Sequence, residues 1–299
     1  MKTYTLQSDG VLKNYNYLSR MTRDRWSWEY MRRDPNYIAD ADMMSPDDVS
    51  GVTVCHSIKV YKSRVPQTIA ERWGLIMMAD PNLNALEANA VWTKEAFPDQ
   101  VAINVLPRAA GETCEIYDKS VTLCKISHFT DSVGREFLLT RGNGCLFQSR
   151  CKGLSLLGMA PVKMDLSITD FESYERKIKA QQEGMRVFGD DPDAQTPIWT
   201  KRTHMLRDGL IALDCLNLGL SQREIANVLY GADRVKDEWD QDRMRDAIKY
   251  IVSRATALRD GGFRMELLGS YLGPNTVAGT QAALDEANDN DQIKQKRGA

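Results

Sequence analysis

The stretch LSQREIANVLYG, residues 220–231, decides how the C-terminal part of this chain folds. Ser221 and Glu224 lie three positions apart and form a capping box, which is a typical start of a helix. Gly231 is the kind of residue at which a helix commonly ends. Between them, apolar residues recur at the spacing of one helical face: Ile225, Ala226, Val228 and Leu229. The sequence therefore predicts a short amphipathic helix here.

Longer helices are predicted on both sides of this stretch. In residues 200–219, leucines form one apolar stripe: Leu206, Leu210, Leu213 and Leu216. Residues 240–262 contain a second stripe at helical spacing: Met244, Ala247, Ile248, Ile251, Ala255 and Leu258. The segment ADRVKDEW, residues 232–239, is expected to be a loop. Two helices braced together, followed by a third with a polar face, are the layout of a helix-turn-helix, whose last helix enters the major groove of DNA.

The polar residues of this unit are the candidate DNA contacts. Arg243, Arg245 and Lys249 lie near the start of the third helix, where recognition side chains reach base edges. Arg254 lies further along the helix, and we expect it to contact a phosphate. Further DNA contacts are expected from Gln241, Arg223, Lys201, Arg202 and Arg207.

The charge of the chain leaves an alternative open. The whole chain has a formal net charge of −2, and residues 201–259 hold 11 Lys and Arg against 9 Asp and Glu. Any nucleic-acid contact must therefore come from a local patch, and the same three helices could equally be a solvated bundle or a protein-docking surface. Salt dependence separates these interpretations, because phosphate contacts weaken steeply as salt rises.

The first 45 residues contain a predicted helix with two different sides. Thr22 is a candidate cap at its start, and Pro35 is expected to end it. Trp26 and Tyr30 lie one turn apart, as do Glu29 and Arg33, which predicts an aromatic side and a charged side. For the aromatic residues Trp26, Trp28 and Tyr30, core packing is favoured over a partner-binding patch.

The middle of the chain is predicted to be rich in β-strands. Strands with one apolar face are indicated by Val52, Val54, Ile58 and Val60, by Val101, Ile103 and Val105, and by VKMDLSI, residues 162–168. RGNG, residues 141–144, supplies the positive-φ residues of a tight hairpin turn. A capping box, TDFE at residues 169–172, predicts a closing helix, and GDDPDAQTP, residues 189–197, a linker.

These patterns predict an α+β protein with four parts. They are a short N-terminal helical segment (1–45), a β-rich middle domain with a closing helix (46–190), an all-α C-terminal helix-turn-helix variant (198–268) and a flexible tail (270–299). The tail is polar and lacks aromatic residues, which is typical of disorder.

No pattern in the sequence indicates catalysis, a metal or a cofactor. The six cysteines form no CxxC pair, and none of the three histidines is spaced as a metal ligand with a cysteine. His56 falls on an apolar alternating face and is expected to be buried. The glycines at 142–144 lack a P-loop lysine, and no GxSxG occurs. We therefore expect no enzyme, no metal and no cofactor, and a cytoplasmic protein without a membrane span.

Several segments resemble one known family. HMLRDGLIALDCLNLGLSQREIANVLYG (204–231), Trp239 and RMRDAIKYIVSRATALRDGGFRMEL (243–267) resemble a proteobacterial helix-turn-helix variant. That domain occurs in RovC-like type VI secretion regulators and in activators and antiactivators of integrative conjugative element transfer. YNYLSRMTRDRWSWEYMRRDPNYIAD (15–40) is similar to the companion domain of the longer activators, and RWGLIMMADPNLNALEANAVW (72–92) to their connecting part.

The resemblance implies an activator that binds double-stranded promoter DNA on a mobile element or a secretion locus. The alternative is an antiactivator-like regulator whose helical domain binds another regulator or RNA polymerase. RNA polymerase and an antiactivator protein are accordingly candidate partners, and a homo-oligomer is expected, since two half-sites add affinity. Asp242, Asp246 and Tyr250 depart from the family pattern, which often has more arginine in the third helix.

Overall fold

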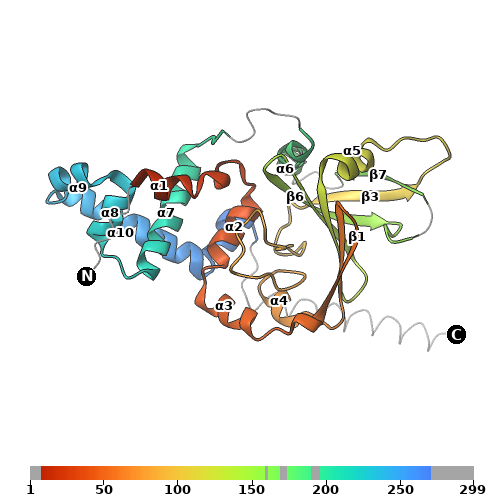
Figure 1. The fold of residues 1–299 in the computed structure, drawn as a ribbon, viewed down its shortest axis with the longest axis horizontal. Helices are drawn as coiled ribbons and strands as arrows, with labels where there is room; N and C mark the ends of the chain where they lie inside the picture. Colours follow the sequence, from red (N-terminus) through yellow and green to blue (C-terminus); the bar gives the residue numbers. More distant parts are fainter. Residues whose placement is uncertain (1–7, 159–160, 169–173, 190–195, 271–299) are drawn as a thin grey trace.

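The computed structural model describes residues 8–158, 161–168, 174–189 and 196–270. Figure 1 shows helices at one end of the described chain, a β-sheet at the other, and α2 and α3 between them. The described chain is thus α+β, as the sequence predicts. The TDFE capping box, most of the linker and almost all of the tail lie outside the described residues.

One mixed sheet of seven strands forms the middle of the chain. Its spatial order is β1-β2-β4-β5-β6-β3-β7, in which β2–β4 and β3–β6 are parallel and the other pairs antiparallel. In chain order the strands are β1 (Val49–Cys55), β2 (Ile58–Ser63), β3 (Val101–Pro107), β4 (Lys125–Thr130), β5 (Glu136–Gly142), β6 (Cys145–Gly153) and β7 (Val162–Ser167). Three helices accompany them: α4 (Thr68–Arg72), α5 (Glu115–Leu123) and α6 (Tyr174–Met185).

The predicted hairpin is confirmed. Gly142 pairs with Cys145, so Asn143 and Gly144 alone form the turn, with φ of 49° and 66°. Positive φ at both positions is the requirement of a type I′ turn, whose twist matches that of the strands. The alternation in β3 is also confirmed, because Val101, Ile103 and Val105 are at most 4% exposed.

The alternating pattern of β1 predicted its strand but not its burial. Val52 and Val54 are 61% and 64% exposed, because β1 lies at the edge of the sheet. His56 lies in the turn after β1 and is exposed, so the prediction that it is buried is wrong. Alternation gives the face of a strand, whereas burial depends on what covers that face.

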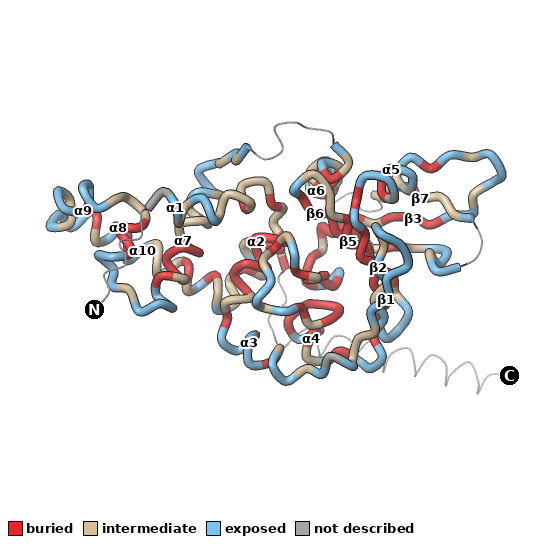
Figure 2. The backbone as a smooth tube through the Cα atoms, viewed as in Figure 1, coloured by how far each residue is buried: buried red, intermediate tan, exposed pale blue. Residues whose placement is uncertain are grey.

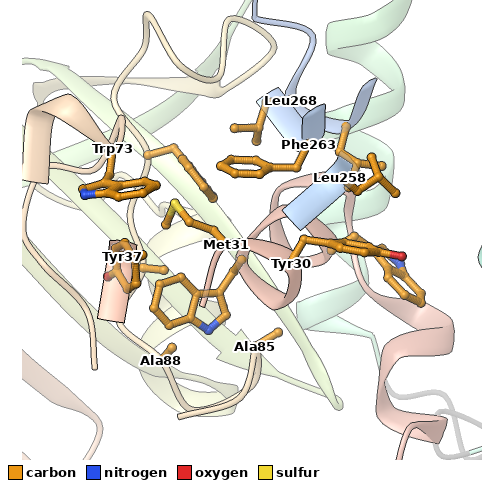
Figure 3. Packing of buried hydrophobic residues seen from close by; sticks show 14 of the residues in the cluster. Tyr30, Met31, Tyr37, Trp73, Ala85, Ala88, Leu258, Phe263 and Leu268 are labelled. Atoms are coloured by element: carbon orange, nitrogen blue, oxygen red, sulfur yellow. The ribbon is translucent and has the colours of Figure 1, made fainter. Parts of the chain in front are cut away.

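The N-terminal helix is buried on both of its sides. It runs as α2 (Arg23–Met31) after Thr22, and Pro35 begins α3 (Pro35–Asp42), for which Asp34 is the N-cap. Trp26, Trp28 and Tyr30 are at most 2% exposed, which confirms core packing over a partner patch. Figure 3 shows Met31 between Tyr37 and Trp73 on one side and Phe263 on the other, with Tyr30 next to Leu258.

The expected charged side of α2 is also buried, which corrects the prediction. Glu29 is fully buried, and its carboxylate accepts hydrogen bonds from Arg32, Arg33, the Tyr17 hydroxyl and the backbone N–H of Ala85. Burial alone would raise the pKa of Glu29, but the two arginines outweigh burial and hold it below its usual value. A buried charge is tolerated when it is paired and hydrogen-bonded in this way.

The C-terminal part is helical throughout. Its elements are α7 (Lys201–Asn217), α8 (Gln222–Tyr230), α9 (Ala232–Glu238), α10 (Asp242–Ala257), η4 (Leu258–Gly262) and η5 (Arg264–Leu268). Two predictions need correction. The expected loop 232–239 is α9, where Val235 is 1% exposed and Arg234 pairs with Glu238 one turn later. Leu216 is 37% exposed, because the residues of α7 that face inward near its end are Ile211, Ala212 and Cys215.

A single core joins the beginning and the end of the described chain. Residues of α2 and of the segment 70–97 share one buried cluster with Leu206, Leu210 and Leu213 of α7 and with η4 and η5. Figure 2 shows this buried zone running through the centre of the molecule, with the mostly exposed helix α9 at one end. The helical end is therefore anchored by an apolar core that includes α2.

Candidate nucleic-acid interface

The predicted capping box begins α8. The Ser221 N–H donates to Glu224 Oε2 at 2.8 Å, and the Glu224 N–H donates to Ser221 Oγ at 3.4 Å. Gly231 ends the helix with a φ of 86°. Ile225, Ala226 and Val228 are buried, as predicted, whereas Leu229, predicted on the same side, is only half-buried. These local features fix where α8 starts, where it stops and which side faces inward.

A second buried cluster holds α8, α9 and α10 on α7. It comprises Ile211, Ala212, Cys215, Ile225, Ala226, Val228, Val235, Met244 and Ile248. Helix α1 (Ser8–Lys13) packs against the same cluster through Val11 and Leu12. The Tyr15 hydroxyl then donates to Asp214 Oδ2 of α7 at 2.5 Å. The N-terminal segment is therefore part of the support beneath the predicted DNA-reading helix.

The start of α10 presents polar side chains to solvent. Gln241 and Arg243 are exposed, and Arg243 makes no ion pair within the described chain. Arg245 Nη2 lies 2.7 Å from Asp242 Oδ1, and Lys249 Nζ lies 3.4 Å from Asp246 Oδ1. Exposed pairs of this kind contribute only about 0.3–0.5 kcal/mol, so they compete weakly with a phosphate or a base for the two cations. The first-turn N–H groups add a positive partial charge at this end.

The other predicted contacts fall into two groups. Arg254 is ion-paired with Glu266, while Arg202 donates to the Glu266 carbonyl at 3.0 Å, so both lie where α10 ends and α7 begins. The hydrogen bond with the Tyr250 hydroxyl, together with the charge of Glu266, outweighs burial and raises the pKa of Arg254. Arg243 and Arg254 are 11 residues apart on α10, which separates them by about 17 Å along the helix axis. Arg223 and Lys201 are exposed near the starts of α8 and α7.

Arg207 differs from the other predicted contacts. Its guanidinium lies 4.9 Å from the centre of the Trp199 ring and 2.8 Å from Asp208 Oδ1, and its side chain is 13% exposed. These contacts hold Arg207 against the protein. Gln241 precedes α10, and Arg243, Arg245 and Lys249 lie on its first two turns, whereas Arg207 on α7 is set apart.

Helix α9 was predicted as a loop, and it lies between α8 and α10 in the chain. It adds exposed Arg234 and Lys236. Arg234 is engaged by Glu238 at 3.1 Å and by the Tyr230 ring, whose centre is 5.2 Å away. The i,i+4 spacing of Arg234 and Glu238 around apolar Val235 was a signal that could have identified the helix.

The described residues contain no group of three or more His, Cys, Asp and Glu side chains that could hold a metal ion. Within the same residues, none of the helices has the length and apolar character needed to cross a membrane.

Comparison with known families identifies two domains. Residues 161–268 match the RovC DNA-binding domain of type VI secretion transcription factors. Residues 12–76 match a proteobacterial transcriptional regulator-like domain. No curated protein matches the chain. The two domain matches occur in the order that the sequence resemblance implies, and they confirm that resemblance.

Proposed function

We propose that this chain, a DNA-binding transcriptional regulator with a RovC-type DNA-binding domain, activates promoters on a mobile element or a secretion locus. It acts as a homo-oligomer on repeated or inverted half-sites, as helix-turn-helix proteins commonly do. RNA polymerase is the partner through which an activator of this kind works. The residues proposed to read the operator are Gln241, Arg243, Arg245 and Lys249, with Arg223, Lys201, Arg202 and Arg254 on the phosphate backbone.

The observation that carries this proposal is the state of Arg243. It is exposed near the start of α10, on a helix whose inner residues Met244 and Ile248 are buried. Its guanidinium has no ion-pair partner within the described chain. An arginine without an ion-pair partner, near the start of a helix held by buried residues, suits two hydrogen bonds to guanine in the major groove.

The acidic residues of α10 support a second candidate. Asp242 and Asp246 each pair with a cation on the same face, which lowers the net positive charge that α10 offers to DNA. A helix face that carries both acidic and basic residues also suits binding to another protein, such as a second regulator. In that case affinity for DNA would be low, and affinity for the protein partner through apolar contacts would depend little on salt concentration.

Selection of sheared genomic DNA by the purified full chain tests the proposal. Bound fragments are sequenced after washes at low and moderate salt. We expect a few fragments that share a repeated or inverted motif to survive the higher salt. Arg243→Ala should lose this enrichment, whereas Arg234→Ala on α9, which lies outside the proposed contacts, serves as the matched control. Unselective binding by the wild-type chain would favour the protein-docking candidate.

A further inference from the structure

A hollow on the sheet is bordered by cations that the proposed operator contacts do not use. It lies beside α6, and its border contains no carboxylate among the residues that the structure describes. The residues that line it are Lys94, Gln100, Val101, Ala102, Arg150, Lys152, Ser167, Lys177 and Gln181. A cation cluster without acidic residues on its border is an electrostatic feature that an anion would satisfy.

Rigid backbone fixes the polar groups of the hollow. Arg150 and Lys152 are two residues apart on β6, so their side chains project from the same face of the sheet. Arg150 pairs with Ala102 of β3, and Ala102 pairs in turn with Ser167 of β7. The guanidinium and the hydroxyl are therefore carried by the same row of three hydrogen-bonded strands. Sites built on strands are positioned more precisely than sites on loops.

The like charges in this cluster act against one another. Burial, together with the charges of Lys94, Arg150 and Lys177, lowers the pKa of Lys152 from its usual value. A bound anion would offset this repulsion and favour the charged form of Lys152. Arg150 and Lys152 are both only partly exposed, so they exchange little hydration for such a ligand.

The size of the hollow limits what can enter it. Its volume is about 20 Å³, which accommodates one oxygen-sized group and no organic body. We propose that it binds one phosphate group through Lys94, Arg150, Lys152 and the Ser167 hydroxyl. One oxygen enters the hollow, and the rest of the phosphate and what it is attached to remain outside. We infer that this phosphate belongs to the backbone of DNA held by the same protein molecule.

The course of α6 favours DNA as the source of the phosphate. Lys177 of α6 borders the hollow, while Arg176 and Lys179 of the same helix border a neighbouring cavity of about 380 Å³. Arg202, at the start of α7, lines that same cavity. Asp24, Asp99 and Glu183 also line that cavity, and Arg176 Nε lies 3.3 Å from Asp99 Oδ1. Lys179 and Arg202 are therefore the cations that lead from the hollow toward the proposed backbone contacts. The match to a DNA-binding domain begins at residue 161 and includes α6. This part of the inference rests on the proposed function.

The test compares one double variant with a matched control in the full chain. Arg150→Gln with Lys152→Gln removes two charges from the hollow, and Lys59→Gln with Lys62→Gln removes two charges from β2, elsewhere on the sheet. For fragments recovered by the genomic selection, we expect the slope of log affinity against log salt to fall by about 0.9 in the first variant, since that is the contribution of one phosphate contact. The control should keep most of the wild-type slope.

Inorganic pyrophosphate tests the hollow without DNA. It should raise the unfolding temperature of the wild-type chain and of the Lys59/Lys62 variant by mass action, and raise it less in the Arg150/Lys152 variant. Without pyrophosphate, the Arg150/Lys152 variant should be at least as stable as the wild type, because repulsion is relieved. A role of these residues in folding alone would instead lower its stability.

The outcomes separate the hollow from the proposed function. If the pyrophosphate effect depends on Arg150 and Lys152 but the DNA slope does not, the hollow takes the phosphate of a small molecule and the DNA part is overturned. If the wild-type chain binds no DNA while the pyrophosphate effect holds, the proposed function fails and the phosphate site stands. Equal slopes and equal pyrophosphate effects in all three proteins overturn the inference entirely.

Discussion

Arg33 and Asp214, 181 positions apart, meet in a two-pronged ion pair between the end of α2 and α7. Arg33 Nε lies 2.7 Å from Asp214 Oδ1, and Nη2 lies 2.8 Å from Oδ2. The same guanidinium also contacts Glu29 Oε2 at 2.7 Å. The pair ties the regulator-like segment to the DNA-binding segment, because each contributes one partner.

Removal of Arg33 should destabilise the whole chain. We expect Arg33→Met to lower the free energy of unfolding by about 2–4 kcal/mol, because Glu29 is left buried without its full set of partners. Urea unfolding measures the change. Arg245→Met, which breaks an exposed pair on α10, is the control and should cost under about 1 kcal/mol. Similar losses in both variants would contradict the role given to the Arg33 cluster.

The same cluster should make stability depend on acid. Burial raises the pKa of Asp214, but the hydrogen bonds and charge of Arg33 outweigh it, so the folded pKa is below the usual value, as it is for Glu29. A lowered folded pKa stabilises the fold above the unfolded pKa, near 4, and this contribution is lost as the pH falls through the folded pKa. The free energy of unfolding should therefore decline below about pH 5, and less steeply in Arg33→Met. Urea titrations between pH 7 and pH 3 test this, and parallel curves for the two proteins would refute it.

Local signals in the sequence predicted the local structure well. The capping box of α8 and the Asn143–Gly144 turn depend on backbone geometry within a few residues, so sequence alone determines them. The burial of α2 could not be predicted in this way. Glu29 and Arg33 have the spacing of a surface ion pair, and only Asp214, far along the chain, turns the pair into a buried cluster.

The candidate interface was likewise predicted where it depends on local sequence and missed where it depends on distant contacts. The polar face of α10 follows from its apolar periodicity, which placed Arg243, Arg245 and Lys249 outward. Arg207 could not be assigned from α7 alone, because Trp199, which precedes the helix, covers it. Helix α9 has the Arg234–Glu238 pair as a local signal, but the packing of Val235 into the shared core is a tertiary contact that this pair does not predict.

Close packing at Gly209 should couple α7 to α2. A Cβ at this position would lie 2.7 Å from the Tyr30 hydroxyl and 3.1 Å from the Ala255 Cβ. We expect Gly209→Ala to cost about 1–3 kcal/mol of stability through overpacking. Tyr30→Phe removes the hydroxyl, so the double variant should lose less than the sum of the two single changes. A double-mutant cycle by urea unfolding measures this coupling, and strict additivity would argue against the close approach.

The joint between α8 and α9 should require glycine. Gly231 has φ 86° and ψ 147°, a conformation that side-chain-bearing residues rarely adopt. Gly231→Ala should therefore cost about 1–3 kcal/mol, although open space surrounds the added methyl group. Gly10→Ala in α1, where space is also open, is the matched control and should be neutral or slightly stabilising. Thermal unfolding measures the stability of both variants, and equal stability would contradict the claim that the backbone conformation at Gly231 requires glycine.

Arg243 and Arg207 should differ in their effects on DNA binding although both are arginines of the DNA-binding match. Arg243→Ala should weaken operator binding by about 1–3 kcal/mol, or about 5- to 150-fold, and relax preference at one base pair. Arg207→Ala should leave base preference unchanged and act on stability, because Arg207 packs on Trp199. Ser253→Ala, an exposed neutral change on α10, is the control. Affinities for the selected operator and its single-base variants, at two salt concentrations, distinguish the cases. Unchanged operator affinity in Arg243→Ala would show that the residues that contact the bases do not lie at the start of α10.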